Sequence, residues 1–200
     1  MVKIPSFGGK SKPPERRRTR RKTLADLHPA WLQVMNWGII VGSVLLCLLL
    51  LPTRFPGTEL LGIGPNWLLI WVVAWSVKRS FWSGTLAGII LGLLQDAITS
   101  PHPSHAITLG LVGFLTAILQ KQRFIQEDFI SIALIVFVMA VVSETLFGFL
   151  LGLGSDRLAK DFIWAYYQRV TLASAILSSL WAPVLYYPLN LWWEKMKVSY

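Results

Sequence analysis

The chain has 200 residues, of which 54% are hydrophobic and only 14% are charged, and its formal net charge is +9. Soluble domains carry about 25% charged residues, so this composition excludes a water-soluble domain and predicts a protein that crosses a membrane several times. Nine of the cations precede the first apolar segment. That placement favours cytoplasmic retention and contact with anionic lipid, and it argues against nucleic acid as a partner.

Residues 1–30 are rich in proline, glycine and arginine, cannot bury apolar area, and are predicted to form a disordered cytoplasmic tail. The segment at 32–51 is about twenty residues long, which exceeds the core of a signal peptide, and no small-residue cleavage site follows it. It is therefore predicted to remain as a transmembrane helix. The tail residues predicted to contact anionic lipid are Arg16, Arg17, Arg18, Arg20, Arg21 and Lys22.

Five more apolar segments follow, and with the first they predict an all-α, polytopic membrane domain of six transmembrane helices over residues 31–193, ending in a short cytoplasmic tail at 194–200. Their expected ranges are 60–77, 81–98, 105–119, 129–153 and 170–193. The aromatic-rich loop at 154–169 is expected to hold a helix lying in the interface, or else a contact surface for an extracytoplasmic partner. Continuous apolar runs without period-two alternation argue against a membrane barrel.

The distribution of lysine and arginine predicts that both termini lie in the cytoplasm. With six crossings, the inner side carries the basic tail together with Lys78, Arg79, Lys121, Arg123, Lys195 and Lys197. The outer side carries only Arg54, Arg157, Lys160 and Arg169. This asymmetry follows the positive-inside rule.

The segment at 81–98 carries Gly84, Gly88, Gly92 and Asp96 at four-residue intervals, which form one stripe along a helix. Glycines on a stripe allow another helix to approach backbone to backbone. A carboxylate in hydrocarbon costs roughly 2.5–3.5 kcal/mol, so Asp96 is expected to face protein or water. We call these four residues the glycine stripe, and they predict a docking site, with a transmembrane helix as the preferred occupant.

A second acid repeats the pattern in the fifth segment, where Gly148 and Gly152 follow Glu144 at four-residue steps. Both acids are expected in the outer half of the membrane. Two interpretations stay open: a shared polar groove for a partner helix or ligand, or internal packing of the third and fifth helices with each acid in a local hydrogen-bond network. The predicted partner-binding residues are Gly84, Gly88, Gly92, Gln95, Asp96, Glu144, Gly148 and Gly152.

The sequence shows no catalytic or metal-binding pattern that would favour a function other than partner binding. His102 and His105 flank a proline, but no acid or cysteine nearby in the sequence completes a coordination set, so a solvated turn is expected. The lone Cys47 lies in the middle of a span. No nucleophile elbow or metalloprotease motif is present, and the sequence therefore predicts no enzyme, no metal and no cofactor.

The run Gly92-Leu93-Leu94-Gln95-Asp96, followed by a short turn and a span with Gly110 and Gly113, resembles the bacterial rod shape-determining MreD family. That family typically shows a glycine-rich helix ending in G-L-L-x-D. Chain length, span count and the basic N-terminus also agree, so the resemblance covers about residues 31–193. The longer basic tail and the Pro-His-Pro turn after Thr99 depart from the family pattern.

The resemblance implies a non-enzymatic integral subunit of the cell-wall elongation (rod) complex in the bacterial cytoplasmic membrane. Such proteins are thought to bind a bitopic MreC-like protein, and through it MreB and the RodA/penicillin-binding synthase pair. The family is also similar in fold to the substrate-binding S components of vitamin (ECF-type) transporters. That similarity leaves open an alternative, a small-molecule (vitamin-type) binding subunit of an uptake transporter, although the spans offer few hydrogen-bonding groups beyond Gln95, Asp96 and Glu144. A secondary transporter would preferably show an internal repeat, and we find no convincing one.

Overall fold

The computed structural model describes residues 29–53, 57, 59–60, 62–99, 104–121, 128–153 and 157–198. Every secondary-structure element named in this part of the chain is an α-helix. The basic tail, including the predicted lipid contacts at 16–22, lies outside the described residues. The six helices are α1 (Pro29–Leu50), α2 (Trp67–Ser76), α3 (Phe81–Thr99), α4 (Ser104–Lys121), α5 (Phe129–Gly152) and α6 (Arg157–Val198).

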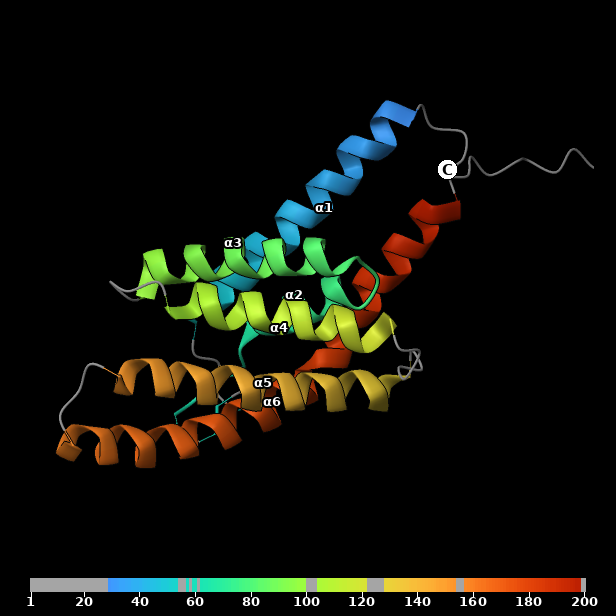
Figure 1. The fold of residues 1–200 in the computed structure, drawn as a ribbon. Helices are drawn as coiled ribbons and strands as arrows, with labels where there is room; N and C mark the ends of the chain where they lie inside the picture. Colours follow the sequence, from blue (N-terminus) through green and yellow to red (C-terminus); the bar gives the residue numbers. More distant parts are fainter. Residues whose placement is uncertain are drawn as a thin grey trace, which may run out of the picture.

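Two antiparallel helix pairs make up most of the domain (Figure 1). The most extensive contacts are those between α3 and α4 and between α5 and α6, and α4 also packs on α5. Each pair is joined by a short connection, which makes neighbouring helices antiparallel by necessity. The order of packing is therefore α3, α4, α5 and α6, with each of these helices beside the next one in the chain.

The short helix α2 occupies the centre and contacts all five other helices. Nine of its ten residues are buried, among them Leu68, Leu69 and Val72 with no exposed surface. Asn66 starts the helix by accepting a hydrogen bond from the backbone N–H of Leu69 at 3.1 Å. A helix of ten residues rises only about 15 Å, half the hydrocarbon thickness, so α2 is a buried core element flanked by irregular chain.

Helix α1 packs mainly on α2 and leaves most of its apolar surface open. Trp31, Val34, Trp37, Val41 and Leu49 are each more than half exposed, a surface suited to lipid rather than to water. Figure 1 shows α1 and the last turns of α6 projecting beyond the stacked helices.

Helix α6 differs from the sequence prediction. A sixth span was expected to begin at residue 170, after an interfacial loop, but the helix runs unbroken from Arg157 to Val198 and contains Pro183 and Pro188. Its first half lies along α5 and its second half turns away (Figure 1). The expected helix in the 154–169 loop is therefore present at residues 157–169, but the prediction of a separate sixth span was wrong because these residues extend α6. The helix also continues beyond residue 193, where the membrane domain was expected to end.

The all-α prediction is confirmed for the described residues. Four helices there are long and apolar enough to cross a membrane: Ala30–Leu50, Phe81–Thr99, Phe129–Gly152 and Trp164–Met196. The apolar helices Trp67–Ser76 and His105–Leu119 are shorter. The expected helix at 60–77 is thus reduced to ten residues, and the count of six crossings remains a prediction.

Candidate functional site

The glycine stripe of α3 lies against α4, the next helix in the chain. Gly84, Gly88 and Gly92 are all buried. A Cβ built on Gly88 would overlap the backbone carbonyl of Leu109, and one built on Gly92 would overlap the Cα of Ala106. The two backbones are therefore in direct contact, which is the approach that glycines permit.

Helix α4 contributes glycines to the same contact. A Cβ on Gly113 would overlap the carbonyl of Gly84, and one on Gly110 would lie 2.8 Å from Cγ1 of Ile89. The sequence interpretation of internal packing named the fifth helix as the partner of α3, and that assignment was wrong because α4 fills the stripe. Partner binding at the stripe stays a prediction, and a partner helix could reach these glycines only if α4 moved away.

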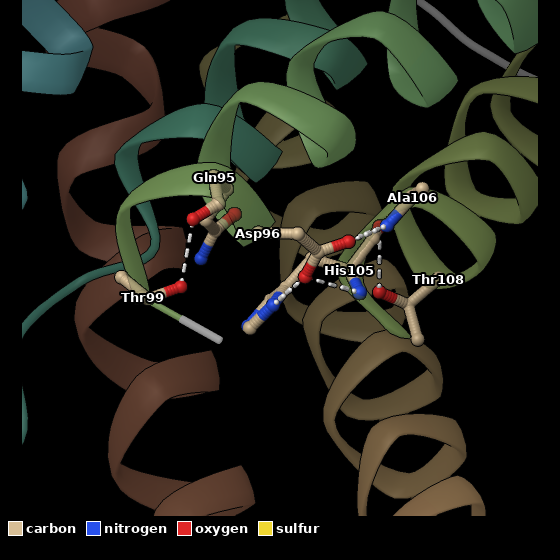
Figure 2. Close-up of polar contacts among 6 residues, drawn as sticks. All are labelled: Gln95, Asp96, Thr99, His105, Ala106 and Thr108. Atoms are coloured by element: carbon tan, nitrogen blue, oxygen red, sulfur yellow. Dashed lines mark hydrogen bonds and ion pairs between the residues drawn. The ribbon is translucent and has the colours of Figure 1, made fainter. Parts of the chain in front are cut away.

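Asp96, at the end of the stripe, binds the first turn of α4 (Figure 2). Its Oδ1 accepts the backbone N–H of His105 at 3.0 Å and lies 2.6 Å from the ring Nδ1 of the same residue. Its Oδ2 accepts the backbone N–H of Ala106 at 3.0 Å. The first N–H groups of a helix have no acceptor within the helix, and a carboxylate placed there also matches the positive end of the helix dipole.

His105 is part of this contact and is not the solvated turn residue that the sequence suggested. Its side chain is only 18% exposed, and its ring lies 4.2 Å, centroid to centroid, from that of Phe147 on α5. Thr108 donates to its backbone carbonyl. The pair of Asp96 and His105 thus joins the ends of α3 and α4 and rests on α5, whereas His102 lies outside the described residues.

Gln95, also on α3, is buried next to Asp96, and its Oε1 has no donor among the described residues. Its backbone carbonyl accepts the hydroxyl of Thr99 at 2.8 Å (Figure 2).

Glu144 forms a second, separate polar contact. Its Oε1 accepts from Asn66 Nδ2 at 3.4 Å and from the Ser174 hydroxyl at 3.2 Å. The backbone N–H of Asn66 in turn donates to the hydroxyl of Ser178 at 2.9 Å. Glu144 therefore connects α5 to the start of α2 and to α6. Each of the two acids accepts from its own set of donors, as the interpretation of local networks expected.

The two glycines that follow Glu144 differ in their surroundings. A Cβ on Gly148 would lie 3.1 Å from Cβ of Tyr167, so this glycine allows close packing of α5 on α6. A Cβ on Gly152 would meet no described atom within 4 Å. Only the first of these glycines is thus needed for helix packing.

Two apolar grooves, which the sequence analysis missed, flank α1 and share α2 as their floor. The α1–α6 groove has a volume of about 620 Å³ and includes Ser43, Leu46, Trp67, Val184, Pro188 and Trp192 in its walls. The α1–α3 groove has a volume of about 790 Å³ and includes Val41, Leu45, Trp75, Ser80, Leu86 and Ile90. The spacing of apolar residues within one helix cannot reveal such grooves, because the walls of each groove come from helices that are far apart in the sequence.

The tryptophans of α2 hold these walls in place. Trp71 donates its indole N–H to the hydroxyl of Ser43 on α1 at 2.9 Å, and Trp75 donates to the hydroxyl of Ser83 on α3 at 3.2 Å. The two indoles stack with their centroids 5.3 Å apart. The floor is thus tied to the wall on each side.

Comparison with known protein families identifies a match over most of the chain. The family model described as "rod shape-determining protein MreD" matches residues 31–196. No curated protein and no solved structure matches the chain. The expected similarity to the S components of vitamin transporters accordingly stays a prediction.

Proposed function

The chain belongs to the MreD family of rod shape-determining membrane proteins, and from this premise we propose that it is a non-enzymatic subunit of the bacterial cell-wall elongation complex. In this proposal it lies in the cytoplasmic membrane with six crossings and both termini in the cytoplasm. It binds a bitopic, MreC-like protein, and through it MreB and the RodA/penicillin-binding synthase pair.

The α1–α6 groove is the observation that carries this proposal. Its walls are almost wholly apolar and come from two helices long enough to span a membrane. Leu46 and Val184, on opposite walls, are 55% and 61% exposed, so the groove is open to the bilayer. A single transmembrane helix from a bitopic protein has the shape and polarity to fill it.

One polar group in this groove favours a polypeptide over lipid as the occupant. Pro188 has no backbone N–H, so the carbonyl of Val184 four residues earlier lacks its usual donor within the helix. A partner helix bearing serine or threonine can supply that donor.

Most of the docking residues predicted from the sequence enter the proposal in a different way. Gly84, Gly88 and Gly92 set how closely α4 approaches α3, and Gly148 sets the approach of α6 to α5. We propose that these contacts, together with those of Gln95, Asp96 and Glu144, act on the partner by fixing the positions of the helices that it binds. Gly152 has no packing neighbour within 4 Å among the described residues and is left out of this role.

Filling the α1–α6 groove should release the partner. We expect Leu46→Trp and Val184→Trp to leave the protein inserted and folded but to lower co-purification of the MreC-like protein by at least tenfold, because roughly 1.4 kcal/mol of lost packing already gives that factor. The measurement is affinity purification from detergent-solubilised membranes, with cell shape scored in a strain that depends on this chain.

The matched controls are Leu49→Trp on α1 and Leu180→Trp on α6. Both residues are more exposed than their counterparts, at 68% and 70%, and neither lines a described groove. If the groove variants retain the partner as well as the controls do, the partner binds elsewhere.

Cysteine labelling tests the topology. In a Cys47→Ser background, cysteines at Thr58, Ser104 and Ser155 should react with a membrane-impermeant reagent from outside, and those at Ser80 and Gln126 should not. The pair at 58 and 80 decides whether the short α2 segment completes a crossing. Outside labelling at Ser80 would contradict the proposed arrangement.

A vitamin-type binding subunit remains the alternative in principle, but it needs a cavity lined by hydrogen-bonding groups. The two grooves described above have apolar walls, and Asp96 and Glu144 already bind groups of the protein itself. We therefore prefer the proposal of partner binding.

A further inference from the structure

The α1–α3 groove is an apolar trough with an exposed arginine beside one end. It follows α3 from Ser80 to Leu94, a rise of about 21 Å at 1.5 Å per residue. One leaflet of the hydrocarbon core is about 15 Å thick. An extended acyl chain that enters at the Ser80 end can therefore lie along the groove through its whole leaflet.

Arg79 is fixed at this end of the groove by a tryptophan of its wall. Its guanidinium carbon lies 4.3 Å from the centroid of the Trp75 ring, and Trp75 is itself held by Trp71 and Ser83. An arginine stacked on an aromatic ring keeps its N–H donors available for a planar or tetrahedral anion. Among the described residues no carboxylate pairs with Arg79, which is exposed.

The neighbouring cation is engaged differently. Lys78 forms an ion pair with Glu194 at 3.1 Å, and its side chain is only 9% exposed. The charge of Lys78 is therefore largely balanced, whereas Arg79 is exposed and lies beside two lining residues of the groove, its stacking partner Trp75 and its chain neighbour Ser80. This arrangement matches a phosphate group, which accepts hydrogen bonds from both a guanidinium and a hydroxyl.

We propose that the α1–α3 groove binds one anionic phospholipid of the cytoplasmic leaflet, with its phosphate at Arg79 and Ser80 and an acyl chain along Val41, Leu45, Leu86 and Ile90. The assignment of the lipid to the cytoplasmic leaflet rests on the proposed topology. The recognition of the phosphate and the acyl chain does not depend on that topology. Charge complementarity at Arg79 separates this groove from the α1–α6 groove, whose lining, among the described residues, includes no charged residue.

Native mass spectrometry of the full-length protein tests the proposal. The probe is an equimolar mixture of dioleoylphosphatidylglycerol and dioleoylphosphatidylcholine added to detergent-purified protein. We expect one phosphatidylglycerol to be retained in preference to phosphatidylcholine. Arg79→Gln should lower that preference by roughly tenfold, as loss of a charge-assisted hydrogen bond would. Ile90→Trp should lower retention of both lipids because it fills the trough.

Two variants serve as matched controls. Arg169→Gln removes an exposed arginine from α6, and Leu93→Trp enlarges an exposed residue of α3 that does not line a described groove. Both should bind lipid as the unmodified chain does. Equal retention of the two lipids by the unmodified chain, or undiminished retention by Ile90→Trp, would overturn the proposal. So would a photo-crosslinker at position 90 that captures a protein helix instead of lipid in native membranes. The lipid measurement uses the purified chain alone, so it remains readable if partner binding at the α1–α6 groove fails.

Discussion

Replacing Gly88 with alanine is expected to destabilise the α3–α4 pair by about 1–3 kcal/mol, the range measured when atoms are forced into a packed interior. The added methyl group would overlap the carbonyl of Leu109 and lie 2.9 Å from the Cα of Gly110, so two backbones would have to separate. Gly88→Leu should be worse and should prevent the pair from closing. The measurement is the midpoint of thermal unfolding in detergent, followed by circular dichroism.

Gly42→Ala is the matched control for this substitution. Gly42 lies within α1, is exposed, and a Cβ there would meet no described atom within 4 Å. Alanine is the better helix former by about 0.5–1 kcal/mol, so this variant should be neutral or slightly more stable. Equal midpoints for Gly88→Ala and Gly42→Ala would mean that α3 and α4 do not touch at Gly88.

Asp96→Leu is expected to have the second large effect, because it leaves the N–H groups of His105 and Ala106 without their acceptor. An unsatisfied group of this kind costs about 1–3 kcal/mol when it is buried. Asp96→Asn should be intermediate, since it keeps the shape and one acceptor oxygen but turns an NH₂ group toward one of the donors. Thermal unfolding in detergent and rescue of rod shape in a dependent strain are the two readouts.

Asp128→Asn controls for the loss of a carboxylate at a helix start. Asp128 precedes α5, is exposed, and its side chain makes no capping hydrogen bond. Its change should stay within about 0.5 kcal/mol, as is usual at the surface. If Asp96→Leu were as mild as Asp128→Asn, the contact with the first turn of α4 would not be a stabilising one.

The spacing of small residues predicted a close helix contact along α3, but the internal-packing interpretation assigned that contact to the fifth helix and was wrong. Four-residue intervals in α3 indicate that a helix approaches there, and a helix does, but the pattern contains no information about which one. Gly110 and Gly113 were visible in the next span and belong to the same contact. The connection at 100–103 is so short that α4 must lie beside α3.

Elements set by tertiary contacts were harder to predict. Hydropathy marks the apolar segment at 60–77 but does not show where its helix begins, so the predicted helix was too long, although Asn66 before Trp67 is a recognisable N-cap. The early start of α6 depends on packing against α5, where Gly148 accommodates Tyr167. The two grooves depend on the angle of α1 to its neighbours, which no local pattern encodes.

The central position of α2 has a consequence for how the protein is made. A chain leaves the ribosome from its N-terminus, so Asn66, the N-cap of α2, emerges before the two residues from α5 and α6 that bind it. Ser178, which accepts the N–H of Asn66, is synthesised 112 residues later, and Glu144 is synthesised 78 residues later. Until both arrive, the backbone and side-chain N–H groups of Asn66 lack these acceptors, and free N–H groups are costly away from water. The start of α2 therefore reaches its final contacts only after α5, and α6 as far as Ser178, have been synthesised.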